Sequence, residues 1–121
     1  MTCDTSKFVI NKGMSNEFII TIKQNDSTLP MIIEDTDTFV ANLFELESNE
    51  LELTTDAVVY DAANGQIIIK LSESEVNELV TERGEKVDRY YLKPTYRLAI
   101  DCNTVNNGNF VAKIANVYVE A

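Results

Sequence analysis

Glu17-Phe18-Ile19-Ile20-Thr21-Ile22-Lys23 is the stretch that decides the fold class. Phe18, Ile20 and Ile22 recur at every second position. Glu17, Thr21 and Lys23 take the opposite face. Successive side chains of a strand point to opposite faces, so a period of two indicates a β-strand with one face toward a core.

The same period continues on both sides of this stretch. Turn signals separate the periodic segments, and the strongest are Asn64-Gly65 and the run 106–109. Pro30 marks an edge or connecting segment and Pro94 a bulge or an edge, because proline donates no hydrogen bond to a central ladder. Many short strands at this spacing favour a β-sandwich in one domain, residues 1–121. Strands are expected at 7–11, 17–23, 38–46, 50–54, 57–61, 66–71, 90–92, 96–101 and 110–119. The segment 57–61 either continues 50–54 or pairs with it, and the last strand has a register change near 115–116.

One segment has a helical period instead. Ser72-Glu73-Ser74-Glu75 matches a capping box, in which Ser72 caps the first turn and Glu75 bonds back. Apolar residues follow at helical spacing, and Gly84 suits the position just after a helix. The sequence therefore predicts a single short helix over 73–83.

The charge is strongly acidic and unevenly placed. The formal net charge is −10; residues 1–61 contain 12 acids and 3 lysines, while residues 62–121 contain 8 acids and 7 bases. No base lies between Lys23 and Lys70, and nine acids follow Asp26 in that interval. This field repels a phosphate backbone, so we expect no direct binding to nucleic acid. Either a solvated, solubilising surface or an acidic face for a basic partner fits the pattern.

No pattern of catalytic residues stands out. The chain has no histidine, which removes the commonest proton shuttle and metal ligand. No phosphate-binding or dinucleotide-binding glycine motif occurs. The acidic run Glu34-Asp35-Thr36-Asp37 has oxygen ligands for calcium but lacks the other features of an EF-hand loop, so a solvated loop is favoured. We expect no enzyme, no cofactor and no bound metal.

The chain also lacks targeting signals. No apolar run reaches the roughly 20 residues of a membrane span, and the start Met1-Thr2-Cys3-Asp4 is not typical of a signal peptide. We therefore expect synthesis in a cytoplasm and no membrane contact. Cys3 and Cys102 are expected to be reduced thiols there.

The order of these segments resembles the immunoglobulin-like modules of tailed-phage virions. It is similar to the N-terminal domain of baseplate upper proteins and to small phage decoration or auxiliary proteins. The segments that support the resemblance are Phe8–Gly13, Thr38–Leu43, Asn64-Gly65, Leu71–Glu75, Arg89–Leu98 and Asn107–Phe110. The resemblance implies an immunoglobulin-like β-sandwich and a non-enzymatic structural subunit of the virion. It implies no active site.

The resemblance also sets the expected partners. They are other virion proteins of the capsid or tail, with copies of the same chain as a further option. The sequence ends just after its last strand, which favours a capsid decoration or auxiliary subunit over a tail or baseplate module. An acidic regulatory protein that imitates DNA and a calcium-dependent carbohydrate-binding module are the alternatives from other classes. Edge position, outward acids and tyrosine content suggest these candidate interface residues: Phe8, Ile10, Glu50, Glu52, Tyr90, Tyr91 and Tyr96.

Overall fold

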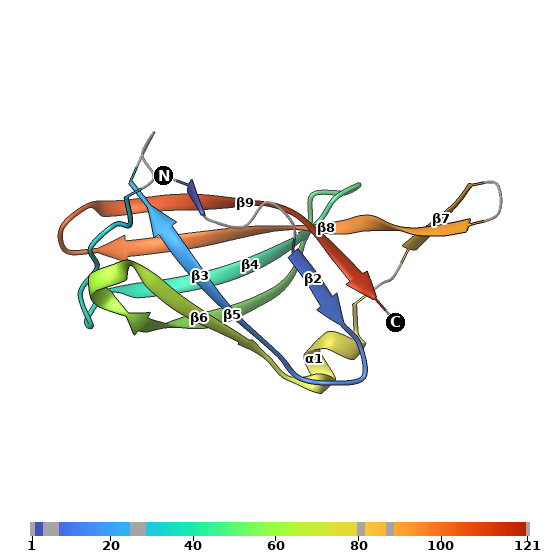
Figure 1. Ribbon diagram of the computed structural model, residues 1–121, viewed down its shortest axis with the longest axis horizontal. Coiled ribbons are helices and arrows are strands. Elements are labelled where there is room, and N and C mark those ends of the chain that lie inside the picture. The colour runs from blue at the N-terminus through green and yellow to red at the C-terminus, as the bar shows by residue number, and fades with distance from the viewer. Residues whose placement is uncertain (1, 4–7, 25–28, 80–81, 87–88, 121) are drawn as a thin grey trace.

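The computed structural model describes residues 2–3, 8–24, 29–79, 82–86 and 89–120 (Figure 1). Nearly all of this is strand, which confirms the all-β prediction. The helical elements of the described part are a short 3₁₀ turn η1 (Ala62–Asn64) and the α-helix α1 (Glu73–Asn77). The strands are β1 (Thr2–Cys3), β2 (Phe8–Asn11), β3 (Asn16–Lys23), β4 (Thr38–Glu45), β5 (Leu51–Asp61), β6 (Gln66–Leu71), β7 (Glu82–Lys86), β8 (Arg89–Thr104) and β9 (Gly108–Glu120).

The strands form one ladder that closes on itself. Their order is β2-β9-β1-β3-β6-β5-β4-β8-β7, and an additional pairing of β8 with β9 completes the ring. The sheet is therefore barrel-like, and the two separate sheets of the expected sandwich are not seen among the described strands. Both β1 and β2 run parallel to β9, along successive parts of the same strand.

β5 joins the two halves of the ring. It pairs with β4 up to Ala57 and with β6 from Ala57 onward, so its hydrogen-bonded neighbour changes at that residue. The sequence leaves open whether 57–61 continues the strand 50–54 or pairs with it, and the structure has one continuous strand. Thr54, Thr55 and Asp56 interrupt the apolar alternation without interrupting the backbone.

The hydrophobic core fills the inside of the ring. Buried side chains from two segments outside the strands cover it, one near each end of β6. Met31 and Ile33 lie buried near the start of β6, where the amide of Met31 donates to the carbonyl of Ile22. Val76 and Leu79, in and just after α1, lie buried near its other end. Lys12 donates to the carbonyl of Leu79 over 2.8 Å, which ties this end to the β2–β3 turn.

The turn before β6 is packed more closely against another segment than the sequence suggests. Asn64-Gly65 predicts a two-residue turn, but Asn64 lies in η1 and only Gly65 has a positive φ, of 64°. A Cβ on Gly65 would lie 2.3 Å from the carbonyl oxygen of Met31. Glycine is therefore required both by the backbone angle and by the close approach of another segment.

α1 begins where the sequence predicts and ends earlier. Ser72 accepts from the amide of Glu75 and Glu75 bonds back to Ser72, so the capping box is confirmed. The expected helix over 73–83 is wrong beyond Asn77, and Gly84 lies inside β7 rather than after a helix. Residues 82–86 offer no apolar stripe to bury, so they take their backbone partners from β8 instead.

β8 is a single long strand where the sequence predicts two. Its pairing with β9 shifts between Pro94 and Tyr96, so the bulge expected at Pro94 is confirmed. A second shift, opposite residues 113–116 of β9, confirms the predicted register change. Among the described residues, positions 89–93 of β8, before Pro94, pair with β7 alone, and this two-stranded ribbon projects from the rest of the molecule (Figure 1). We call the ribbon, β7 with residues 89–93 of β8, the arm, and the closed ring with its core the body.

Candidate protein-binding surfaces

The candidate interface residues fall into three environments. Phe8, Ile10 and Tyr96 are buried in the core, so their side chains are not on the surface of the isolated chain. They point inward because their strands have their apolar face toward the inside of the ring. Glu50 and Glu52 are exposed, as expected. Tyr90 and Tyr91 belong to the arm by their backbone, while their side chains are outside the described part.

A different set of apolar side chains does reach the surface. Ile19 of β3 lies opposite Ile68 of β6, and Ile68 lies opposite Val58 of β5. Ile19 is 49% exposed and Val58 60%, and Tyr60, two residues farther along β5, is 57% exposed. Directly opposed residues of one face are neighbours, so these side chains line up across three strands. We call Ile19, Ile68, Val58 and Tyr60 the apolar row.

Polar pairs border the apolar row on both sides. Lys70 and Glu17 form an exposed ion pair of 3.9 Å on one side. Gln66 donates to Thr21 over 3.5 Å on the other. An apolar centre with a polar border is the usual arrangement of a protein–protein interface.

Sequence reasoning missed the apolar row, although a signal for it is present. The alternation of Phe18, Ile20 and Ile22 assigns the inner face of β3 correctly but draws attention away from Ile19. Ile67-Ile68-Ile69 and Val58-Val59 are continuous apolar runs, which place apolar side chains on both faces of a strand. Such runs in neighbouring strands were sufficient to predict an apolar outer face.

A second surface is strongly acidic. The β4–β5 connection and the strand ends beside it contain Glu45, Glu47, Glu50 and Glu52, which we call the acidic turn. Asn49 turns the chain with a φ of 58°, and Arg97 donates to its side-chain oxygen over 2.6 Å. The Arg97 guanidinium also lies 5.0 Å from the centre of the Phe44 ring. The turn is thus held in place from β8.

The acidic run 34–37, which offers oxygen ligands for calcium, stabilises the local structure instead. The carboxylate of Asp37 is buried and accepts from the amides of Glu34 and Val105, at 2.8 and 2.9 Å. Both oxygens are therefore occupied in joining this loop to the β8–β9 turn. Within the described ranges, no three acidic or thiol side chains lie together in a way that would hold a metal ion.

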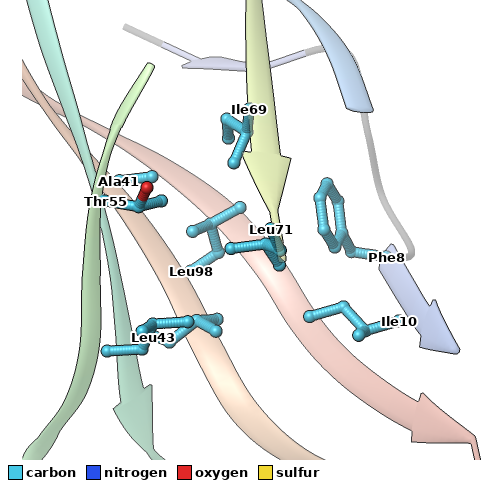
Figure 2. Close-up of a pocket in the computed structure, with 9 residues that line it drawn as sticks. Phe8, Ile10, Ala41, Leu43, Thr55, Ile69, Leu71 and Leu98 are labelled. Atoms are coloured by element: carbon cyan, nitrogen blue, oxygen red, sulfur yellow. The ribbon is translucent and has the colours of Figure 1, made fainter. Parts of the chain in front are cut away.

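The apolar gap found among the described core residues is too small for a ligand. Figure 2 shows an apolar gap lined by residues of β2, β4, β5, β6 and β8, and the free space is about that of one water molecule. Such a gap stays empty of polar molecules because its lining gives them no hydrogen bonds. The lining residues are Phe8, Ile10, Ala41, Leu43, Leu53, Thr55, Ile69, Leu71 and Leu98.

Comparison with known proteins gives this chain no family. No protein-family model matches it, and no curated protein matches it. No helix in the described part is long and apolar enough to cross a membrane. The apolar row, the acidic turn and the arm are therefore the features from which a function has to be inferred.

Proposed function

We propose that this protein is a non-enzymatic structural subunit of a bacteriophage particle, attached through protein–protein contacts as a capsid decoration or auxiliary subunit. The apolar row is the observation on which the proposal rests. Half-exposed aliphatic side chains gain about 1 kcal/mol each when a partner covers them. The polar side chains around the row would then form the rim of the contact.

The strand pairing supports an immunoglobulin-like reading of the barrel-like sheet. Because β5 changes neighbours at Ala57, the ring divides into a group with β3, β6 and the end of β5, and a group with the start of β5, β4, β8 and β9. Two such groups facing each other over one core form a β-sandwich. This division agrees with the resemblance of the sequence to virion modules.

The backbone offers a second means of attachment. Among the described strands, β2 stands at one end of the strand order and pairs with β9 alone. An unpaired strand edge accepts an extended segment of another protein. Phe8 and Ile10 are buried beneath this edge, so the contact would use backbone groups rather than these side chains.

The experiment is quantitative mass spectrometry of washed phage particles. The protein should be present at a fixed copy number per particle, and Val58→Asp should lower that number at least about tenfold while the thermal melt stays unchanged. Val111→Asp is the matched control, because Val111 is 48% exposed and lies outside the apolar row. Absence of the protein from washed particles would refute the proposal.

A tail or baseplate location is the first alternative. The same measurement on separated heads and tails distinguishes it, since a decoration subunit remains with the heads. An acidic regulatory protein is the second alternative, favoured by the exposed acidic turn. Recovery of a host DNA-binding protein, and of no virion subunit, in a pull-down would favour that reading.

A further inference from the structure

We infer that the first half of β5 binds an extended segment of a partner protein, in which basic and apolar side chains alternate. The binding site consists of the strand edge at residues 51–56 and the groove between this edge and α1. We call the two together the β5 groove. It is separate from the apolar row and does not require the particle role proposed above.

The strand edge exists because β5 changes neighbours. β5 pairs with β6 from Ala57 onward, whereas the segment 51–56 is paired with β4. From Ala57 toward α1 the two strands diverge, since β6 runs on to the helix and β5 leads to the β4–β5 connection (Figure 1). Among the described strands, 51–56 therefore has a ladder partner on one side only. Such an edge presents backbone N–H and C=O groups to an incoming strand.

The register shows which backbone groups face the open side. The amide of Ile22 donates to the carbonyl of Gly65, so odd-numbered residues here bond β3 and even-numbered residues of β6 bond β5. Ile68 accordingly bonds Val58, which lies opposite it. Thr54 precedes Val58 by an even number of residues, so its N–H and C=O point the same way. No described strand pairs with Thr54 on that side.

The groove beside this edge has room for side chains. Its free volume is about 480 Å³. The residues that line it are Glu52, Leu53, Ser74, Glu75, Glu78 and Leu79. Leu53 is half-buried and packs against the core, so the apolar part of the lining continues the core toward the surface. An added strand would place the side chains of one of its faces in this space.

The surroundings of the edge set the chemistry of the partner segment. Its side chains alternate between two faces. Those directly opposite Thr54 and Asp56 would face outward, beside the exposed carboxylates of Glu52 and Asp56. Opposite charges stabilise such cross-strand pairs, so lysine or arginine is favoured there. The side chains between them would lie on the same face as Leu53 and enter the groove, where apolar groups are favoured.

The same charges disfavour a second copy of this edge as the partner. Two such edges paired antiparallel around Thr54 would place Glu52 of each copy opposite Asp56 of the other. Like charges directly opposite each other destabilise a strand pair. A basic segment would instead neutralise these carboxylates, so the occupant is a different chain.

Peptide binding to the full chain tests this site, with fluorescence anisotropy as the measurement. The probe is a capped peptide of alternating lysine and valine, with four lysines and three valines. It should bind at least about tenfold more tightly than a peptide of the same composition in which all lysines precede all valines. Both peptides have the same charge, so the difference measures alternation rather than attraction to an acidic protein.

N-methylated forms of the probe test the backbone pairing. The lysines lie directly opposite residues whose backbone groups face the edge, so lysine amides donate to β5 and valine amides point away. Methylation of the lysine amides should therefore remove the tenfold preference. Methylation of the valine amides should leave it in place.

A proline in the edge is the matching change in the protein. Thr54→Pro removes an amide that faces the open side and should lower the affinity at least about tenfold, with a folded protein in the thermal melt, because sheet edges tolerate proline. Thr54→Val loses the hydroxyl that donates to Asn42 but keeps the amide, and should bind as wild type does. If Thr54→Pro does not fold, the two methylated peptides decide the same question on the wild-type chain.

Charge reversal tests the preference for a basic segment. Glu52→Lys with Glu78→Lys should weaken binding at least about tenfold. Asp35→Lys with Asp61→Lys makes the same change of net charge near the other end of β6 and should weaken binding less than about threefold.

Three results would overturn the inference: no binding of the alternating peptide, equal affinities for the alternating and block peptides, or equal effects of the two methylations. Absence of the protein from washed particles would refute the proposed function and leave the β5 groove in place. Particles that carry the protein, while the peptide does not bind, would do the reverse.

Discussion

The body and the arm are built from the same kind of strand but held by different means. In the body every long strand has ladder partners, and its inner face is covered by a common core. In the arm, the strand pairing described for β7 and residues 89–93 of β8 is with each other alone. A strand-forming sequence is thus enough to form a two-stranded ribbon. The ribbon is stable by itself only when one of its faces is buried against other elements.

The largest effect is expected in the body, at Gly65. Gly65→Val combines an unfavourable positive φ with a Cβ placed against the Met31 carbonyl, and should reduce the free energy of unfolding by at least about 4 kcal/mol. Gly108→Val is the control, because Gly108 has a φ of 71° but open space around its Cβ. It should cost roughly 1–3 kcal/mol. Equal melting temperatures for the two variants would show that close packing at Gly65 is not important.

A smaller effect is expected where the body meets the arm. Ser72→Ala removes the side-chain acceptor for the Glu75 amide and should cost about 1 kcal/mol in a denaturant titration. Ser74→Ala, in the same helix, leaves that bond in place and should change the stability by less than half as much. A Ser72→Ala protein as stable as its parent would indicate that the cap does not hold this end of the body.

The smallest effect on stability is expected in the arm itself. Lys86→Glu should change the free energy of unfolding by less than about 0.5 kcal/mol, because Lys86 is a charged residue in the last described ladder pair of β7 with β8. Hydrogen exchange sharpens the comparison: in dilute monomer, arm amides should exchange far faster than those of β4. Arm amides as protected as those of β4 would remove the distinction between the two regions.

Much of the body could be predicted from periodicity, because burial on one face leaves a period of two in the sequence. β3, β4 and β6 lie where alternation places them, and Ser72 begins the helix as its motif indicates. The end of the helix could not be predicted in the same way. Gly84 suits a helix end, but it lies in β7 because this segment pairs with β8. Such pairing between strands depends on tertiary structure, which a local capping pattern does not indicate.

The candidate site was predicted less well than the fold. Glu50 and Glu52 are exposed as predicted, because acids on an alternating strand face solvent. Tyr96 is buried, because it alternates with Leu98 and Ile100 on the inward face of β8. The apolar row depends on which strands become neighbours. Ile19, Ile68 and Val58 are far apart in sequence, and only the register places them in one line.

The parallel pairing of β2 with β9 has a consequence for the order of folding. Phe8 finds its partner Val117 about 110 residues later in the chain. Closing so long a loop is slow, and the contact cannot form during synthesis until β9 has left the ribosome. Until then, the edge of β2 that pairs with β9 has no partner. The nascent chain is consequently most prone to wrong strand pairing just before its last strand is made. The ring of strands closes when β9 pairs with its neighbours.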